Sequence, residues 1–179
     1  MHKPTLLELF EHPKAQKHIQ RSGVVHAIAS SYHAFKLAKE YDVNPSLACK
    51  AALLHDIGHH TWYREDGQWD FERYRANDIH AIKGAERAHK ILIELGEDRE
   101  TAKEISLAIL LHTDSYLPEG TLKLSPLQKV VKLADEADEE PDGKHHYRMM
   151  AYEKAVKLIR KLDEKIQQDQ STARFQQTS

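Results

Sequence analysis

The sequence predicts an all-α protein that folds as a single domain. Its 179 residues include only seven glycines and six prolines, and few segments show the two-residue alternation that is typical of a strand. Apolar residues instead recur at helical spacing, and residues that start helices recur along the chain. A chain of this length is of single-domain size and can bury a proper core. We find no internal repeat and no interdomain linker.

Composition limits the class of protein and its partners. Forty per cent hydrophobic and 30% charged residues are typical of a soluble globular protein. No apolar run approaches the length of a membrane span, and residues 1–5 lack a signal-peptide core. The single Cys49 excludes an internal disulfide and suits a reducing cytoplasm. We expect Cys49 to be a buried, apolar residue. We therefore expect a cytoplasmic protein without a membrane partner. A net charge of -2 gives no electrostatic reason to expect nucleic acid as the main partner.

The first elements are helices that surround an insertion. A helix is expected over 26–38. Asn44 and Pro45 then form an N-cap and first helical residue, which start a helix running to His55. Residues 59–78 form an aromatic and arginine-rich insertion. This insertion could overhang a site, or it could be a surface excursion held down by its own aromatic side chains.

Three further helices complete the predicted body. One opens at His80 and ends at Gly96, a plausible C-cap. Glu97 and Asp98 suit the first turn of the next helix by their charge, and that helix runs to His112. The pair Ser125-Pro126 repeats the start signal before a helix that carries an aspartate.

The C-terminal region is predicted to contain one amphipathic helix, at about 145–168. Its apolar stripe should dock on the body of the protein or on a second subunit, which would give a homodimer. The stripe consists of Ala155, Leu158, Ile159, Leu162 and Ile166. Residues 169–179 are rich in Gln, Ser and Thr, and we expect a disordered tail there. The predicted domain therefore spans 1–168, with its motifs within 20–140.

The doublet His55-Asp56 is the most informative feature of the chain. It lies at the polar end of an otherwise apolar helix, where both side chains are costly to bury without a partner. A bound cation is the simplest partner, because imidazole and carboxylate together suit Fe, Mn, Co, Ni or Zn. His112 and Asp135 also lie on the apolar faces of their helices. Gly84, one turn after His80, permits the close approach of a neighbouring helix.

These motifs resemble the HD superfamily of metal-dependent phosphohydrolases, which is named after the His-Asp doublet. A histidine followed after about three turns by Leu37-Ala38 is similar to the first motif of the superfamily, and Leu133-Ala134-Asp135 to the last. Two additional histidines resemble the extra ligands of its dinuclear branch. The resemblance implies an HD-type helical bundle that holds divalent metal, with two ions drawn from Fe, Mn, Co or Ni. The implied ligands are His26, His55, Asp56, His80, His112 and Asp135.

The resemblance also implies an activity, which is hydrolysis of a phosphoester or phosphoanhydride by a metal-activated water. Asp56 would bridge the two metals and so is expected to be catalytic. Segments 112–114 and 124–135 are similar to the symmetric diadenosine-tetraphosphate hydrolases of the superfamily. We therefore expect a small phosphorylated substrate that is nucleotide-like.

Four further residues are candidates for roles around the metals. His59 replaces the lysine that often follows the doublet, and we expect it to be catalytic together with Asp56, either by supporting the ligands or by contacting substrate; the alternative is a plain helix-end histidine. Lys83, Arg87 and Lys132 are expected to bind phosphate, with an arginine from 64–75 as a further candidate. The alternative for each of these cations is a solvated surface charge.

Two other classes of function remain open. Some HD proteins, including myo-inositol oxygenase and a phosphonate-cleaving oxygenase, use the same ligand types to hold a mixed-valence di-iron centre and act on a polyol or phosphonate. The run His55-Asp-Ile-Gly-His59 resembles the phosphonate enzyme, whereas Asp135 follows His112 by only 23 positions, as in the hydrolases. The third class is a non-catalytic module that binds a nucleotide. The intact ligand set argues against it.

Overall fold

The structure is a computed structural model that describes residues 3–60, 64–66, 68, 70–114, 122–138 and 148–177. Side chains are described for all of these except 71 and 173–177. Within these residues the chain forms α-helices and no strand, which confirms the all-α fold class. The helices are α1 (Leu6–Glu11), α2 (Pro13–Ser22), α3 (Val24–Glu40), α4 (Pro45–Leu54), α5 (Phe71–Asn77), α6 (His80–Glu94), α7 (Arg99–Leu110), α8 (Pro126–Glu136) and α9 (Tyr152–Gln177).

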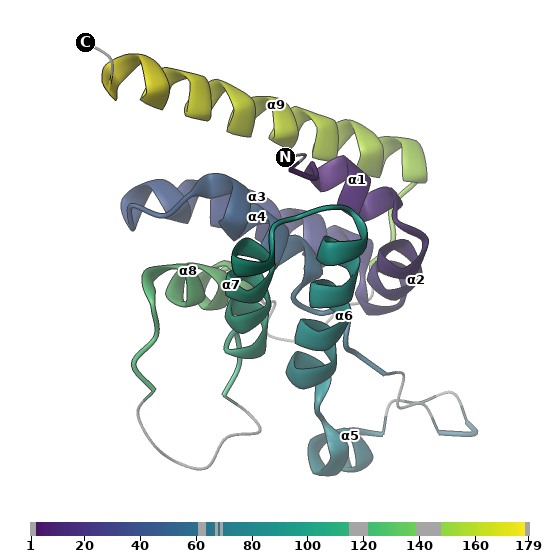
Figure 1. Cartoon of the computed structure of the whole chain (residues 1–179). Helices are drawn as coiled ribbons and strands as arrows, with labels where there is room; N and C mark the ends of the chain where they lie inside the picture. Colours follow the sequence, from purple (N-terminus) through teal and green to yellow (C-terminus); the bar gives the residue numbers. More distant parts are fainter. Residues whose placement is uncertain are drawn as a thin grey trace.

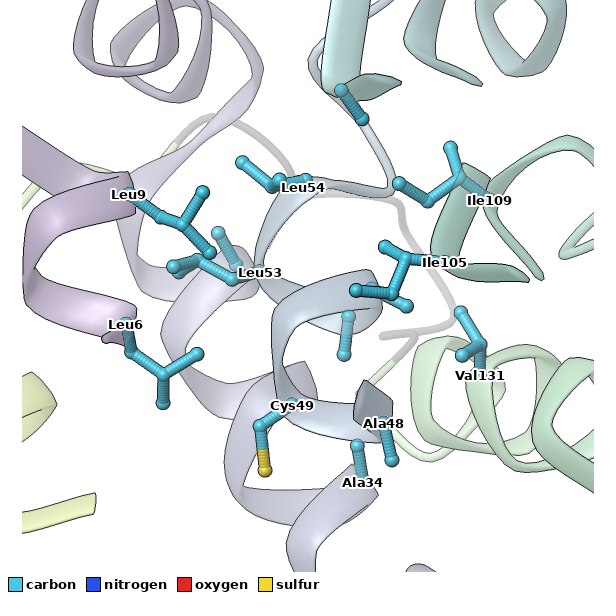
Figure 2. Close-up of a cluster of buried hydrophobic side chains, with 14 of the residues drawn as sticks. Leu6, Leu9, Ala34, Ala48, Cys49, Leu53, Leu54, Ile105, Ile109 and Val131 are labelled. Carbon is cyan, nitrogen blue, oxygen red and sulfur yellow. The ribbon is translucent and has the colours of Figure 1, made fainter. Parts of the chain in front are cut away.

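The core lies around α4, which packs against α3, α7 and α8. In this core, Leu53 of α4 lies beside Leu9 of α1, and Ile105 and Ile109 of α7 lie on the other side of α4 (Figure 2). Cys49 is fully buried there, as expected, and burial raises the pKa of its thiol. The helix that ends at the doublet is thus held by contacts with α1, α3, α7 and α8. It therefore gives the following residues a fixed position.

The predicted start signals act as caps. The Asn44 side chain accepts a hydrogen bond from the backbone N–H of Ser46. Ser125 forms a reciprocal capping box with Gln128, which satisfies two otherwise unpaired N–H groups. Gly96 adopts a φ of 88° just after α6, a conformation that glycine tolerates best. These contacts confirm where α4 and α8 begin and where α6 ends.

The start of α7 differs from the expectation that Glu97 and Asp98 both lie in its first turn. Asp98 is the N-cap and accepts from the N–H of Thr101. Glu97 precedes the helix, is only 4% exposed, and forms an ion pair with Lys50 of α4 at 2.5 Å. The buried lysine partner outweighs the preference of the carboxylate for a helix N-terminus. This pair links α4 to the α6–α7 connection.

The long helix α9 lies along α1 and α3 (Figure 1). Four of the five predicted stripe residues are buried, and Leu158 is half-buried. The stripe therefore docks on the body, the first of the two alternatives. Asp163 of α9 accepts hydrogen bonds from the N–H groups of Leu6 and Leu7, at 2.9 and 3.1 Å. Part of the N-terminus of α1 is thus satisfied by a side chain from α9.

The limits of α9 differ from the expected range of about 145–168. The helix begins at Tyr152 and continues to Gln177, past residue 169, where we expected a disordered tail. Gln, Ala and Arg have good intrinsic helix propensity, and extending an existing helix needs no new nucleation. The domain boundaries themselves stay a prediction. Among the described residues, no helix is both long enough and apolar enough to cross a bilayer.

Candidate metal centre

A first cluster of ligand atoms forms where α3, α8 and the end of α4 meet. The Nε2 atom of His26 lies 3.0 Å from Oδ1 of Asp135 and 3.6 Å from Oδ2 of Asp56. The Nε2 atom of His55 lies 3.3 and 3.4 Å from the same two oxygens. All four side chains are buried. The ligand atoms of two imidazoles and two carboxylates, from three parts of the chain, therefore lie close enough together to bind one cation.

A second cluster shares Asp56 with the first. Its other oxygen, Oδ1, lies 3.8 Å from Nε2 of His80 and 3.7 Å from Nε2 of His112. The Nε2 atom of His59 lies closer, at 3.2 Å. Each oxygen of Asp56 thus faces a different set of imidazoles. This arrangement is the one that a carboxylate bridging two cations requires.

The outer ring nitrogen has a fixed acceptor in four of these histidines, which are His26, His55, His80 and His112. Nδ1 of His55 donates to the carbonyl oxygen of Ala52, and Nδ1 of His112 donates to that of Ile109, both at 2.6 Å. A carbonyl can only accept, so these nitrogens hold the proton of the neutral ring. The Nε2 lone pair then points inward, which is the orientation that a metal-binding histidine needs.

Carboxylates hold the two remaining histidines in the same way. Nδ1 of His26 donates to Oδ2 of Asp138 at 2.8 Å, and Nδ1 of His80 donates to Asp78 at 2.7 Å. Neither aspartate was predicted from the sequence to have a role. Asp138 lies one turn after Asp135, and Asp78 lies two residues before His80. Acidic residues at these short spacings from ligand candidates are the signal that could have identified them.

The short distances between neighbouring imidazole nitrogens indicate whether the residues fit a metal. The Nε2 atoms of His26 and His55 are 3.1 Å apart, and those of His80 and His112 are 3.2 Å apart. With each proton on Nδ1, two lone pairs face each other in both pairs, and this is unfavourable unless a cation or a proton lies between them. Imidazole nitrogen and carboxylate oxygen are also suitable donors for divalent transition metals. The residues fit a metal.

The pKa values show that the first cluster attracts positive charge. Burial opposes protonation of His55, yet the carboxylates of Asp56 and Asp135 raise the pKa of His55 to about 10. Burial also opposes ionisation of Asp135, but the charge on His55 holds the pKa of Asp135 well below its usual range. In the second cluster, burial and then the charge of His55 lower the pKa of His112 to about 4. The carboxylates of the first cluster thus favour positive charge at His55, whereas burial and the charge of His55 disfavour it at His112.

Two glycines bring α6 against the residues that follow α4. A Cβ atom on Gly58 would lie 1.8 Å from the carbonyl oxygen of His80 and 2.4 Å from the nitrogen of Gly84. A Cβ atom on Gly84 would lie 3.1 Å from the carbonyl oxygen of His55. The close approach expected at Gly84 is therefore present, and the tighter contact is at Gly58. This contact places His80 beside the doublet.

His59 lies within the centre rather than at a solvent-facing helix end. Its ring stacks on that of His80, with centroids 4.0 Å apart and 9° between the planes. Its other face lies toward Tyr74 of α5, with centroids 6.2 Å apart. Asp56, His59 and His80 also form a third group that could hold an ion. The catalytic role of His59 stays a prediction.

The three predicted phosphate-binding cations occupy different surroundings. Nζ of Lys83 lies 3.1 Å from Nε2 of His60. Arg87 donates from Nη1 to the carbonyl oxygen of Ile57 at 2.6 Å, directly after the doublet. Lys132 pairs with the exposed Asp114 at 3.2 Å. Their roles in binding stay predictions.

The insertion is only partly described. Trp62, Tyr63, Gly67 and Trp69 lie outside the described residues. Within the described part, Arg64 pairs with Asp70 at 3.6 Å, and Arg73 and Arg75 are exposed on α5. Among the described side chains of this region, Tyr74 stacks on His59 of the centre, with ring centroids 6.2 Å apart. Part of the insertion therefore approaches the site, which favours the first of the two interpretations for α5.

Comparisons with known proteins agree with this geometry. A family model described as the HD domain matches residues 23–140, which contain the whole candidate metal centre. A Bacillus subtilis (strain 168) protein named "Putative phosphohydrolase YueE" is 63% identical over 172 residues. The alignment covers 96% of this chain and 97% of that protein. No solved structure matches the chain.

Proposed function

The chain belongs to the HD domain family, and on that premise we propose how its centre acts. The protein is a metal-dependent phosphohydrolase, and its fold is the HD-type helical bundle. The observation that carries the proposal is the position of Asp56, whose two oxygens face separate imidazole clusters. Divalent metal bound there would supply an activated water and the charge that stabilises phosphoryl oxygens.

We propose two ions, held by the six family residues. His26, His55 and Asp135 would hold one ion, His80 and His112 the other, and Asp56 would bridge them. The mixture of nitrogen and oxygen donors favours Fe, Mn, Co or Ni. The carboxylates of Asp78 and Asp138 keep the His80 and His26 rings oriented. Such supporting contacts are typically worth ten- to a hundredfold in metal affinity.

The proposed substrate is a small phosphorylated compound, and we favour a nucleotide. The support is the similarity of segments 112–114 and 124–135 to diadenosine-tetraphosphate hydrolases. Lys83 and Lys132 belong to α6 and α8, which also carry His80 and Asp135, and this supports the proposal that both lysines contact phosphate oxygens. We further propose that His59 contacts the substrate, because its Nε2 lies 3.2 Å from Oδ1 of Asp56, the carboxylate that we propose as the bridge.

The decisive experiment is Asp56→Asn, which keeps the shape of the side chain and removes its charge. We expect loss of at least one metal ion per chain and at least a hundredfold loss of phosphatase turnover, since the metal contribution is several kcal/mol. Metal content should be measured by mass spectrometry, and turnover on p-nitrophenyl phosphate and on a nucleotide panel. Asp42→Asn is the matched control, because Asp42 is exposed and its φ of 52° suits asparagine.

Two results would contradict the proposal. One is near-normal hydrolysis by Asp56→Asn at the metal content of the wild type. The other is an absence of phosphatase activity in the wild type with Mn, Co, Ni or Fe, together with oxygen consumption in the presence of ferrous iron. The second result would favour the oxygenase alternative.

A further inference from the structure

A cluster of basic side chains extends from the doublet turn along α6 to α2. Lys83 and Arg87 follow His80 on one face of α6, after one and two turns. Arg87 lies 3.4 Å from Nδ1 of His18 in α2, and α2 packs against α6. Arg21 of α2 lies close enough to lower the pKa values of neighbouring groups. We call this set the basic cluster; it comprises His18, Arg21, His60, Lys83 and Arg87.

Each of two contacts within the basic cluster pairs a cationic side chain with a histidine. Lys83 lies 3.1 Å from Nε2 of His60, and Arg87 lies 3.4 Å from Nδ1 of His18. Lysine and arginine can only donate, so each histidine accepts and stays neutral. The opposite ring nitrogens of His18 and His60 then carry protons. The cluster therefore presents several N–H donors and at least three full positive charges.

Electrostatic repulsion within the cluster appears in its pKa values. Burial and then the charges of Arg87, Arg21 and Lys17 lower the pKa of His18 to about 4. Burial and then Lys83 and Arg87 lower the pKa of His60. Holding like charges together is unfavourable, and an anion that binds among them relieves the repulsion.

Within the described part of the chain, Glu86 offsets the charge of the cluster only in part. Glu86 is the carboxylate that raises the pKa of Arg87, against burial and Arg21. However, Glu86 accepts a hydrogen bond from Lys90 at 2.6 Å and is exposed. His18, Arg21, Lys83 and Arg87 are half-buried and His60 is exposed. The cluster is therefore open to a soluble anion.

We propose that the basic cluster binds a second anionic group of the substrate, beyond the phosphate that is hydrolysed. This proposal rests on the proposed function of the metal centre. Lys83 lies roughly 5 Å, and Arg87 roughly 10 Å, along α6 from His80. The substrate class is therefore an organic phosphate with a second phosphate or carboxylate about 5–10 Å from the reacting one. Arg87 also anchors to the backbone of Ile57, which fixes the cluster relative to the doublet.

The test compares two substrates that differ only in the second anion, adenosine 5′-monophosphate and adenosine 3′,5′-bisphosphate, with the metal-loaded full-length chain. Arg21→Ala should lower kcat/KM for the bisphosphate at least tenfold more than for the monophosphate, since hydrogen bonds to charged groups are worth that much. The loss should be mainly in KM. Arg160→Ala is the matched control, an exposed arginine of α9, and it should change neither value. Equal losses on both substrates, or no loss, would overturn the proposal.

A binding measurement separates this proposal from the proposed function. Inorganic phosphate should raise the pKa of His18, followed by NMR, in the wild type but not in Arg21→Ala. If the wild type hydrolyses neither nucleotide, the hydrolase proposal fails. The NMR measurement still tests whether the basic cluster binds an anion. A phosphate-dependent rise that needs Arg21 supports the anion site. An unchanged His18 pKa at saturating phosphate overturns it.

Discussion

Gly58→Ala should separate α6 from the doublet without touching any proposed ligand. The added Cβ atom would lie 1.8 Å from the His80 carbonyl oxygen and 2.4 Å from the Gly84 nitrogen. Ordinary contact begins at 3.4 Å, so α6 must withdraw by roughly 1.5 Å. Both atoms belong to the backbone of a helix, and no side-chain rotation can relieve the contact. The helix, and His80 with it, must move.

The size of that shift sets the expected losses. His80 approaches Asp56 at 3.8 Å and His112 at 3.2 Å, and the withdrawal is a large part of either distance. A misplacement of about 1 Å can cost on the order of a hundredfold in rate. Overpacking costs about 1–3 kcal/mol, and each kcal/mol lowers the Tm of a chain of this size by about 2–4 °C. We expect the Tm of Gly58→Ala to fall by roughly 2–12 °C and metal to be lost from the second cluster.

The assay measures metal content, Tm by circular dichroism, and phosphatase turnover on the same preparations. Gly84→Ala is the matched control, because its Cβ would meet the His55 carbonyl oxygen at 3.1 Å and needs a shift of only a few tenths of an ångström. Alanine also gains about 1 kcal/mol of helix propensity over glycine there. If Gly58→Ala retained the Tm, metal content and turnover of the wild type, this contact would not be what holds α6 in place.

Two predictions concern stability rather than chemistry. Lys50→Met leaves Glu97 buried without its partner, so the free energy of unfolding, measured by denaturant titration, should fall by about 3–5 kcal/mol. The double variant Lys50→Met/Glu97→Leu should recover most of that loss. Equal losses in the single and double variants would contradict this explanation. His18 has a pKa of about 4 in the folded protein against 6.5, so the unfolded chain binds more protons between these values and stability falls as pH drops from 6.5 to 4. Because His18 is half-buried, solvent screening reduces the expected change in the free energy of unfolding over this pH range to about 1 kcal/mol. His18→Gln should flatten the plot of stability against pH between 4 and 6.5. An unchanged slope would show that the pKa of His18 is not lowered in the folded protein.

Much of the fold could be predicted from local sequence. The caps at Asn44 and Ser125 and the apolar stripe of α9 depend on neighbouring residues along one helix, so the sequence shows them directly. The end of α9 could not be located in this way. Its last residues are polar but favourable for helix, and composition alone does not distinguish a continued helix from a frayed one.

The candidate site was partly predictable for a related reason. The structure brings together the six residues that the motif order and helical faces indicate, although their role as ligands stays a prediction. The supporting carboxylates Asp78 and Asp138 were not identified, since their partners become neighbours only when the rings of His80 and His26 adopt one orientation. The Lys50–Glu97 pair was also missed. It joins two segments whose contact depends on tertiary packing, and no local pattern specifies it.

The arrangement of α6 explains why the metal centre and the basic cluster should respond together. One face of this helix carries His80, Gly84 and Arg87 on successive turns, and Arg87 donates to the backbone directly after the doublet. A withdrawal of α6 would therefore stretch the Arg87–Ile57 hydrogen bond as well as move the imidazole. A packed helix moves as a unit. In the proposed enzyme, α6 would therefore position both the residue at the reacting phosphate, His80, and the residues that bind the second anion. The spacing between them is then set by the helix and not by a loop, and it should discriminate between substrates by the distance between their two anionic groups.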